Sequence, residues 1–279
     1  MTTRRPAAFA AAAILTIALA ACGGDPPVPQ LTDPTEILAA AAGQTAAATS
    51  VHIDLTGEGE LSLAVGPGSA PFIIDDTTAS ADIDLVAGEG RATFAIPGVL
   101  GLRGEVIVVD GTAYAKTSLT GAQYMAVPVG APGPADPSAP PASASMLAAL
   151  TELLARPELA PVKGDDVDCG GSTCYAVRVE LTADELAGLA GEGAGIELPI
   201  PSGLPIPIPD LSSLAGLDVT VQVEKATTRL AGLTLVATTS ADAGVAGAGV
   251  EATADLRFSK WDETVSVDAP PADQVQGGG

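Results

Sequence analysis

The sequence is poor in the residues that catalytic and redox sites use most often. Its 279 residues include one histidine, one tryptophan and three cysteines, and only 3% are aromatic. A Ser-His-Asp or Cys-His system therefore has only His52 to draw on, and no Gly-x-Ser-x-Gly elbow accompanies it. Phosphate-cradling glycine loops and dinucleotide fingerprints are also missing. We expect no enzyme, no cofactor and no metal site. A hydrolase that uses His52, with Asp54 beside it, is the alternative.

Basic residues are scarce as well, with 12 Lys and Arg against 34 Asp and Glu, and a net charge of −22. Such a chain should avoid nucleic acid and should be repelled by anionic lipid headgroups. The acidic pairs Asp75-Asp76 and Asp165-Asp166 lie in predicted turns, and we interpret them as solvated. A glycosidase-like pair of carboxylates stays an alternative, although sugar clefts usually contain several aromatic residues.

The first 22 residues have each part of a lipoprotein signal. Arg4 and Arg5 precede an apolar run from Ala7 to Ala21, which is short for a membrane span, and Leu-Ala-Ala-Cys closes it at Cys22. We expect residues 1–21 to be a removable signal peptide and the Cys22 thiol to carry a diacylglycerol, with palmitate among its acyl chains. Residues 22–33 would then be a tether. An ordinary secretory signal is the alternative.

This anchor would place the protein on the extracytoplasmic (periplasmic) side of the cell membrane. Loss of the two arginines with the signal takes the net charge from −22 to −24. Membrane attachment would therefore depend on the acyl chains, because the mature chain has no basic patch to supply it.

Two cysteines remain, in Cys169-Gly-Gly-Ser-Thr-Cys174. Outside the cytoplasm, an isolated pair across a Gly-Gly turn is typical of a disulfide that closes a small hairpin. A metal site would need further ligands, and a redox pair would more typically be spaced Cys-x-x-Cys. We predict the disulfide and keep these two alternatives.

Most of the remaining chain alternates apolar and polar residues with a period of two, which is typical of antiparallel strands with one wet face and one covered face. The clearest alternations cover residues 51–56, 82–85, 177–181, 219–224 and 253–258. Residues 106–109 are an exception, because they are apolar on both sides, and Asp110-Gly111 after them is a hairpin turn signal.

Three helices are predicted beside these strands. Asp33-Pro34 opens an Ala-rich helix to about Thr49, a stripe of leucines with Met146 marks a second helix, and a capping box at Thr182–Glu185 opens a third. Residues 34–272 would form a single domain and 273–279 a disordered tail. The Pro-rich segment 128–141 is predicted to be an exposed loop. A second such segment, Ile196–Pro209, is apolar, and it either caps the core or forms the lip of a pocket.

Four segments carry a resemblance to a known family. They are the lipobox at Cys22 and residues 49–53, 109–116 and 259–270. In order and spacing they resemble mycobacterial and actinobacterial lipoproteins of the LppX/LprAFG type. The resemblance implies an α+β fold: a strongly curved antiparallel β half-barrel with a few helices on the concave face and an apolar cavity between. The cavity would take acyl chains of lipids or glycolipids for transfer across the periplasm. The apolar segment Ile196–Pro209 and the low aromatic content depart from the family pattern.

The primary hypothesis is thus a tethered, monomeric protein that binds a lipid or glycolipid and helps to move it toward the cell envelope, with a membrane lipid transporter as a candidate partner. The alternative is a structural or interaction lipoprotein with a filled core. The residues expected to line the lipid site are Ile83, Leu85, Val106, Val108, Leu147, Leu150, Leu154, Leu256, Ile206 and Ile208.

Overall fold

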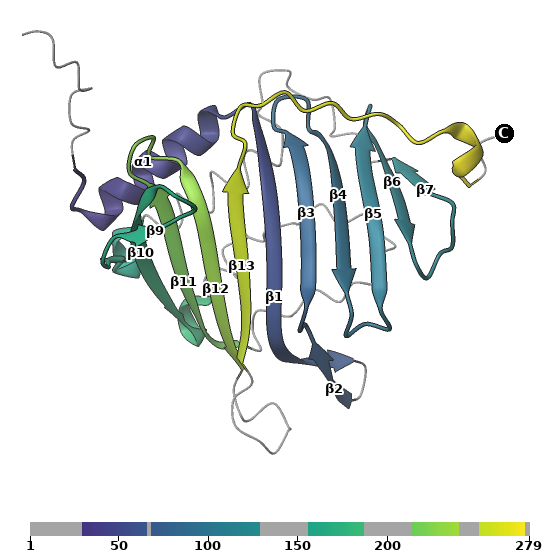
Figure 1. Cartoon of the computed structure of the whole chain (residues 1–279). Coiled ribbons are helices and arrows are strands. Elements are labelled where there is room, and N and C mark those ends of the chain that lie inside the picture. Colours follow the sequence, from purple (N-terminus) through teal and green to yellow (C-terminus); the bar gives the residue numbers. More distant parts are fainter. Residues whose placement is uncertain (1–29, 66–67, 129–155, 187–213, 240–250, 277–279) are drawn as a thin grey trace, which may run out of the picture. The chain divides into compact units, whose positions relative to one another are not determined.

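The computed structural model describes residues 30–65, 68–128, 156–186, 214–239 and 251–276, with side chains for all of these except 61–72, 157 and 239. The chain forms two units, Met1–Gln30 and Leu31–Gly279. The second unit contains every element described below (Figure 1).

The first element is the helix α1 (Pro34–Ala47), which begins as the sequence predicts. The Asp33 carboxylate caps it by accepting hydrogen bonds from the backbone N–H groups of Thr35 and Glu36, and Pro34 occupies the first turn. Ile37, Leu38 and Ala41 on one side of α1 are fully buried. The helix therefore adds one apolar stripe to the core.

The rest is dominated by one antiparallel sheet that does not close on itself. Its strands are β1 (Ser50–Val65), β2 (Gly68–Ile73), β3 (Thr77–Asp84), β4 (Glu89–Ile96), β5 (Leu102–Val109), β6 (Thr112–Thr117), β7 (Met125–Pro128), β8 (Val162–Lys163), β9 (Val167–Asp168), β10 (Thr173–Thr182), β11 (Leu214–Glu224), β12 (Leu230–Thr239) and β13 (Glu251–Ser259). The strand order is β7-β6-β5-β4-β3-β1-β13-β12-β11-β10-β8, with β2 paired to β1 and β9 to β10.

The central strand β1 joins the two halves of this sheet, because it pairs with β3 on one side and with β13 on the other (Figure 1). Beyond Gly59, which has φ +108°, β1 leaves this ladder and pairs with β2 instead. A side chain at Gly59 would lie 2.3 Å from the carbonyl oxygen of Glu251, so only glycine fits this crossing of β1 past β13.

The strand registers put the alternating apolar residues on one side of the whole sheet, which we call the apolar face. Residues paired across neighbouring strands share this face. They include Tyr175 and Val223 at the β10 end of the sheet, Ile53 and Ala81 in the middle, and Met125 at the β7 end. The opposite side, the polar face, carries residues such as Arg178, Thr220, Asp255 and His52. The predicted division into a covered and a wet face is confirmed in this respect.

The main core lies where α1 contacts β10, β11 and β12. Ile37 and Leu38 of the helix belong to the same buried cluster as Val177 and Val221 of the sheet. Trp261 closes one side of the cluster, where its indole N–H donates to the Leu230 carbonyl oxygen at 3.1 Å and its ring stacks on Phe258.

A second, smaller cluster explains why residues 106–109 are apolar on both sides. Ile107 and Val109 point to the polar face, where they pack with the buried Tyr124. Val267 and Val275 cover them. These two belong to residues 260–276, here called the C-terminal strap, which passes from the end of β13 across to the β7 end of the sheet (Figure 1).

The strap ends in a short 3₁₀ helix, η3 (Ala272–Gln274), and a parallel bridge between Tyr124 and Val275. The Tyr124 N–H donates to the Gln274 carbonyl oxygen, and the Gln276 N–H donates to that of Tyr124. Residues 273–276 are thus ordered, in contrast to the disordered tail predicted there, because two backbone hydrogen bonds to a buried tyrosine hold them.

Several sequence predictions can be compared with this fold. The hairpin turn at Asp110-Gly111 is present, with φ +50° and +69°, and the capping box at Thr182–Glu185 makes its expected hydrogen bonds. Pro128, predicted to begin an exposed loop, is instead the last residue of the edge strand β7. The predicted helix with Met146 and the segment Ile196–Pro209 lie outside the described residues.

Candidate functional site

The two halves of the apolar face differ in the size of their side chains. Strands β10 to β13 contribute mainly valine and leucine with one tyrosine and one phenylalanine. Strands β3 to β6 contribute a run of small residues, here called the small-residue track: Ala79, Ala81, Gly90, Ala92, Gly104, Ala113 and Ala115. Small side chains leave room above a sheet, so this half needs more material over it to exclude water.

Burial follows the same division. Val177, Val179, Val221 and Val223 of the first half are at most 1% exposed. The larger side chains around the small-residue track, such as Ile83, Phe94, Val106 and Val108, are only half-buried. The valines beside α1 are therefore buried, although Leu217 and Leu235 of the same half are half-buried. In the other half, Ala113 and Ala115 are buried at 1% and 2% exposed, and accessible aliphatic surface remains at the four larger side chains.

Three of the predicted lining residues come together in this second half. Ile83 and Val108 both pair with Gly90, one from β3 and one from β5, so their backbones lie about 10 Å apart with a glycine between them. The Ile83 side chain leans over this glycine, with Cγ1 3.6 Å from where a Cβ atom of residue 90 would lie, and it also packs against the main core. Val106 stands between Ala92 and Ala115 in the same way. We call this row of small residues, with the aliphatic side chains of Ile83, Val106 and Val108 beside it, the furrow.

Phe94 ends this furrow. A Cβ atom at Gly104 would lie 2.4 Å from Cζ of Phe94, so the phenylalanine ring occupies the space above that glycine. Aromatic rings often cover glycines on neighbouring strands in this manner. The furrow therefore runs from Gly90 past Ala92 and is closed at the Gly104 end.

The other predicted lining residues are placed differently. Leu85 is 1% exposed and belongs to the main core, and Leu256 packs half-buried against that core. The remaining five lie outside the described residues: Leu147, Leu150, Leu154, Ile206 and Ile208.

Phe94 and the small-residue track are absent from the predicted lining. A signal for them exists in residues 78–82, where Ala79 and Ala81 alternate with Thr78, Ser80 and Asp82. This signal was missed because alanine is common throughout the chain and a single alanine contributes little hydrophobicity.

On the polar face, His52 lies between two carboxylates. Its Nδ1 is 2.7 Å from Oδ1 of Asp82 and its Nε2 is 3.2 Å from Oδ2 of Asp54. The sequence predicts Asp54 on this face, and the register of β3 on β1 adds Asp82. A general base needs a free ring nitrogen to take a proton from a hydroxyl. Both nitrogens are engaged here, so the geometry does not favour a hydrolase at His52.

A network of charged groups fixes the β7 end of the polar face. The Tyr124 hydroxyl donates to Glu105 at 2.6 Å, and Arg91 and Lys116 form ion pairs with the same carboxylate. Burial by itself would raise the pKa of Glu105, but the hydrogen bond from Tyr124 and the two cations outweigh it and lower the pKa below its ordinary value of 4.5. Glu105 therefore stays ionised in the folded protein.

Asp262 fixes the other end of the strap. Its carboxylate accepts hydrogen bonds from the backbone N–H of Thr49 at 2.8 Å and from the Thr49 hydroxyl, and it pairs with Arg229. The hydrogen bond from the Thr49 backbone is the main reason that the pKa of Asp262 lies below 3.8; burial opposes it, and Arg229 supports it. The carboxylate joins α1, β1, β12 and the strap at one point.

We expect Asp262→Asn to lower the melting temperature at pH 7 by about 2–4 °C, which corresponds to about 1 kcal/mol in a domain of this size. Because the folded pKa of Asp262 is depressed, the stabilisation is fully present above pH 3.8 and is lost as the pH falls through the folded pKa. The difference between the two proteins should therefore shrink below pH 3.8 in thermal unfolding followed by circular dichroism. Glu58→Gln, at an exposed carboxylate of β1, is the control. A difference independent of pH would contradict the assigned role.

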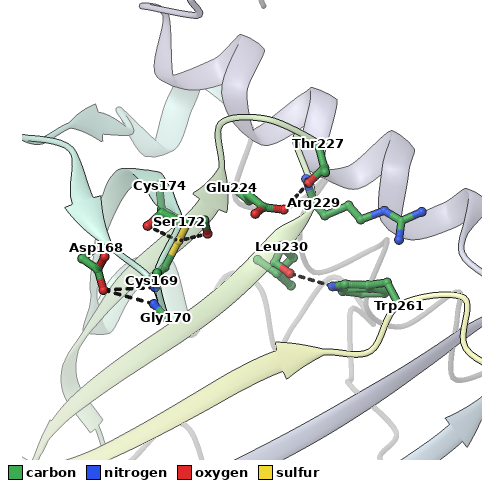
Figure 2. The surroundings of a disulfide bond; sticks show 11 residues. Asp168, Cys169, Gly170, Ser172, Cys174, Glu224, Thr227, Arg229, Leu230 and Trp261 are labelled. Carbon is green, nitrogen blue, oxygen red and sulfur yellow. Dashed lines mark hydrogen bonds between the residues drawn. A yellow bond between two sulfur atoms is a disulfide. The ribbon is translucent and has the colours of Figure 1, made fainter. Parts of the chain in front are cut away.

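At the opposite edge of the sheet, Cys169 and Cys174 form the predicted disulfide (Figure 2). It closes the hairpin between β9 and β10, whose turn uses Gly170 and Gly171 at φ +86° and +95°. The Asp168 carboxylate accepts hydrogen bonds from both glycine N–H groups. A ring of this size removes about 2 kcal/mol of chain entropy from the unfolded state, so the bond has a structural role.

Next to the disulfide, Tyr175 contacts Leu31, the first residue of the second unit. Its hydroxyl accepts a hydrogen bond from the Leu31 N–H at 2.9 Å, and its ring lies near the ammonium groups of Lys225 and Lys163, at 4.8 Å and 5.6 Å. Both lysines pair with Asp166. The point where the predicted tether meets the domain is thus held by a tyrosine that is 2% exposed.

The described residues contain no group of three or more histidine, cysteine, aspartate or glutamate side chains placed to hold a metal ion. Across the same residues, no helix is both long and apolar enough to cross a membrane.

Comparison with known proteins identifies similar structures but no family model. No family model and no curated protein matches the chain. It is similar to the crystal structure of LprF from Mycobacterium bovis, with 17% identity, a TM-score of 0.49, and coverage of 85% of this chain and 96% of that chain. For the lipoprotein LppX of Mycobacterium tuberculosis the identity is 15% and the TM-score 0.44, with 84% and 98% of the two chains covered.

A third similar structure is MucB in complex with MucA(peri), with 13% identity, a TM-score of 0.32, and coverage of 88% of this chain and 60% of that chain. The similarities to LprF and to LppX each extend over most of both chains, at low identity.

Proposed function

We propose that this protein is a membrane-anchored, extracytoplasmic lipid-binding protein with no chemistry of its own. Acyl chains on Cys22 would tether it, and the apolar face of the sheet would hold an acyl chain of a lipid or glycolipid. Transfer of that lipid toward the cell envelope, with a membrane lipid transporter as a candidate partner, is part of the proposal. So are the monomeric state and the curved half-barrel with an apolar cavity.

The observation that carries the proposal is the small-residue track with its half-buried walls. An alkyl chain is about 4–5 Å wide, and in the proposal it lies along the small residues between β3 and β5, whose backbones stand about 10 Å apart at Gly90. Each CH₂ group removed from water contributes about 0.8 kcal/mol, so even a partly buried chain would bind. The furrow offers aliphatic contacts without directional polar groups, which favours a hydrocarbon over a sugar or a nucleotide.

The distribution of buried side chains over the apolar face also supports lipid binding. A structural protein with a filled core needs large buried side chains over the whole face, whereas among the described residues they are concentrated in the cluster that includes α1. The segments 129–155 and 187–213 contain the predicted lining residues Leu147, Leu150, Leu154, Ile206 and Ile208. In the proposal these two segments supply the opposite wall of the cavity.

The test is lipid analysis of the protein after gentle purification. A chain of residues 23–279, made without its signal and acylation site, should contain about one lipid per protein by native mass spectrometry, with the lipid released by organic extraction. The same chain, stripped of lipid, should take up a fluorescent fatty acid. Spectra free of lipid together with no uptake of the probe would favour the filled-core alternative.

A further inference from the structure

Three large apolar side chains are exposed at one end of the strands of the β2–β7 half. Leu100 is 89% exposed, Leu119 is 56% exposed and Ile73 is 45% exposed. We call these three residues the tip patch. None of them belongs to either buried cluster or to the furrow described above.

The connections place the three residues at one strand end. Leu100 is in the turn between β4 and β5, Leu119 is in the turn between β6 and β7, and Ile73 ends β2. A Cβ atom at Gly98 would lie 1.9 Å from the Ile73 carbonyl oxygen, so the β4–β5 turn rests directly on Ile73. Backbone hydrogen bonding of Ser118 to Arg103 joins the β6–β7 turn to the start of β5. The lower part of Figure 1 shows β2 and the β4–β5 turn at this end.

The turn that carries Leu100 is built to present it. Gly101 donates to the Pro97 carbonyl oxygen, and Leu102 donates to that of Val99, so the turn is closed by its own backbone. Leu100 itself has φ +52°, a left-handed conformation that is uncommon for a residue with a bulky side chain. A leucine held there costs conformational energy and gains no burial, which points to a contact outside the domain.

The composition of the turns indicates the kind of contact. Residues 97–101 and 118–123 contain no charged side chain. The adjoining β2–β3 turn contains Asp75 and Asp76, both exposed. Separate aliphatic side chains on uncharged turns suit shallow insertion between lipid headgroups. Among the described residues beside these turns, the two carboxylates outnumber the one exposed cation, Arg103 at the start of β5, which disfavours an anionic surface.

We propose that the tip patch docks the domain onto the surface of an electrically neutral lipid bilayer. Leu100 and Leu119 enter the headgroup region, and Ile73 supports the β4–β5 turn from behind. This docking goes beyond lipid binding in the furrow, and it does not require the furrow to be occupied.

The tether meets the domain at the other end of the strands. Leu31 contacts Tyr175 near the start of β10, which the registers place at the same end as Ser259 and His52. The nine residues 22–30 reach about 30 Å when extended, and a strand such as β4, with eight residues, is about 27 Å long. The tip patch reaches the anchoring membrane only when the tether is nearly drawn out. Docking is therefore weak and reversible.

The experiment uses residues 23–279, which contain the whole described core, since every residue of the two clusters lies at position 31 or later. Binding to phosphatidylcholine vesicles is measured by flotation. We expect the unmodified chain to bind, and Leu100→Ser with Leu119→Ser to lower the partition coefficient at least tenfold. Val86→Ser is the matched control, because Val86 is 67% exposed in the β3–β4 turn at the opposite strand end. It should change binding less than twofold.

A second measurement does not depend on affinity. A Leu100→Cys variant carrying an environment-sensitive fluorophore should shift to the blue when vesicles are added, and the same label at Val86→Cys should not. Phosphatidylglycerol in the vesicles should weaken binding at low salt. Lipid content by mass spectrometry should be unchanged in the serine variants, which separates this docking from lipid binding in the furrow. Absence of vesicle binding, an equal loss with Val86→Ser, or a Leu100-dependent dimer in sedimentation would overturn the proposal.

Discussion

Val106→Trp is expected to lower the lipid content of the purified protein at least tenfold while the protein stays folded. Val106 is half-buried on the apolar face between Ala92 and Ala115. An indole ring there covers the two alanines and fills the furrow that the acyl chain would occupy. Ala115 is 2% exposed, whereas Ala92 is half-buried, so we expect the ring to enter on the β4 side and to displace ligand there rather than to push strands apart.

The control for this substitution is Val236→Trp. Val236 is a half-buried valine on β12 that pairs with Asp218 and Thr253 on the polar face. The Val236→Trp substitution adds the same indole ring at a half-buried position outside the proposed site. Lipid content by native mass spectrometry should match that of the unmodified protein, and melting temperatures of both variants should stay within about 5 °C of it.

The pair of variants separates two outcomes. Loss of lipid in Val106→Trp alone supports the furrow as the site. Full lipid content in Val106→Trp, with normal unfolding, would show that the acyl chain lies elsewhere on the apolar face. Val108→Trp is a second substitution in the same furrow, because Val108 pairs with Gly90 and Ala113, and we expect the same result.

Cys22→Ser is expected to abolish the incorporation of radiolabelled palmitate into the protein. The thiol is the proposed attachment point of the acyl anchor, and a serine hydroxyl does not replace a thiolate as nucleophile. The measurement is growth of an expressing bacterium with labelled palmitate, followed by gel electrophoresis of the purified protein. Stable anchoring needs more than one acyl chain, so the same variant should also leave the detergent-rich phase in detergent partitioning once its signal is removed.

A double variant, Cys169→Ser with Cys174→Ser, controls for label bound through another cysteine. Those two sulfur atoms are joined in the disulfide and should carry no label, so incorporation should equal that of the unmodified protein. Label that persists in Cys22→Ser would contradict the assignment of the anchor. It would leave an ordinary secretory signal as the explanation of the N-terminal segment.

Local sequence signals predicted the secondary elements well. The N-cap at Asp33, the turn at Asp110-Gly111 and the disulfide hairpin each depend on a few neighbouring residues with a specific backbone requirement, and all three are present. The alternating strands were also identified, since a period of two is visible over five or six residues. Strands β4 and β12 were not among those identified, and neither were the two-residue strands β8 and β9. Strands β2 and β7 were missed because they are short, and both contain proline.

The candidate site was predicted only in part, for a related reason. Ile83, Val106 and Val108 are aliphatic and stand out in an alternating pattern, whereas the glycine and alanines between them do not. What makes the site is their pairing, Ile83 and Val108 with Gly90 and Val106 with Ala92, and pairing depends on register between strands. The second carboxylate at His52 was missed for the same reason, because Asp82 is 30 residues away.

The anchor motif, the acidic charge, the disulfide and a sheet with one apolar side could all be predicted from the sequence, since these are properties of composition or of short segments. The tertiary structure decided which half of the apolar face α1 packs against and that the C-terminal strap covers Ile107 and Val109 on the polar face. It also decided that Leu100, Leu119 and Ile73 are exposed at one strand end. These features arise from contacts between residues tens to hundreds of positions apart. Local patterns are compatible with several strand registers and with several ways to cover each face, and the free energy of packing determines which of them forms.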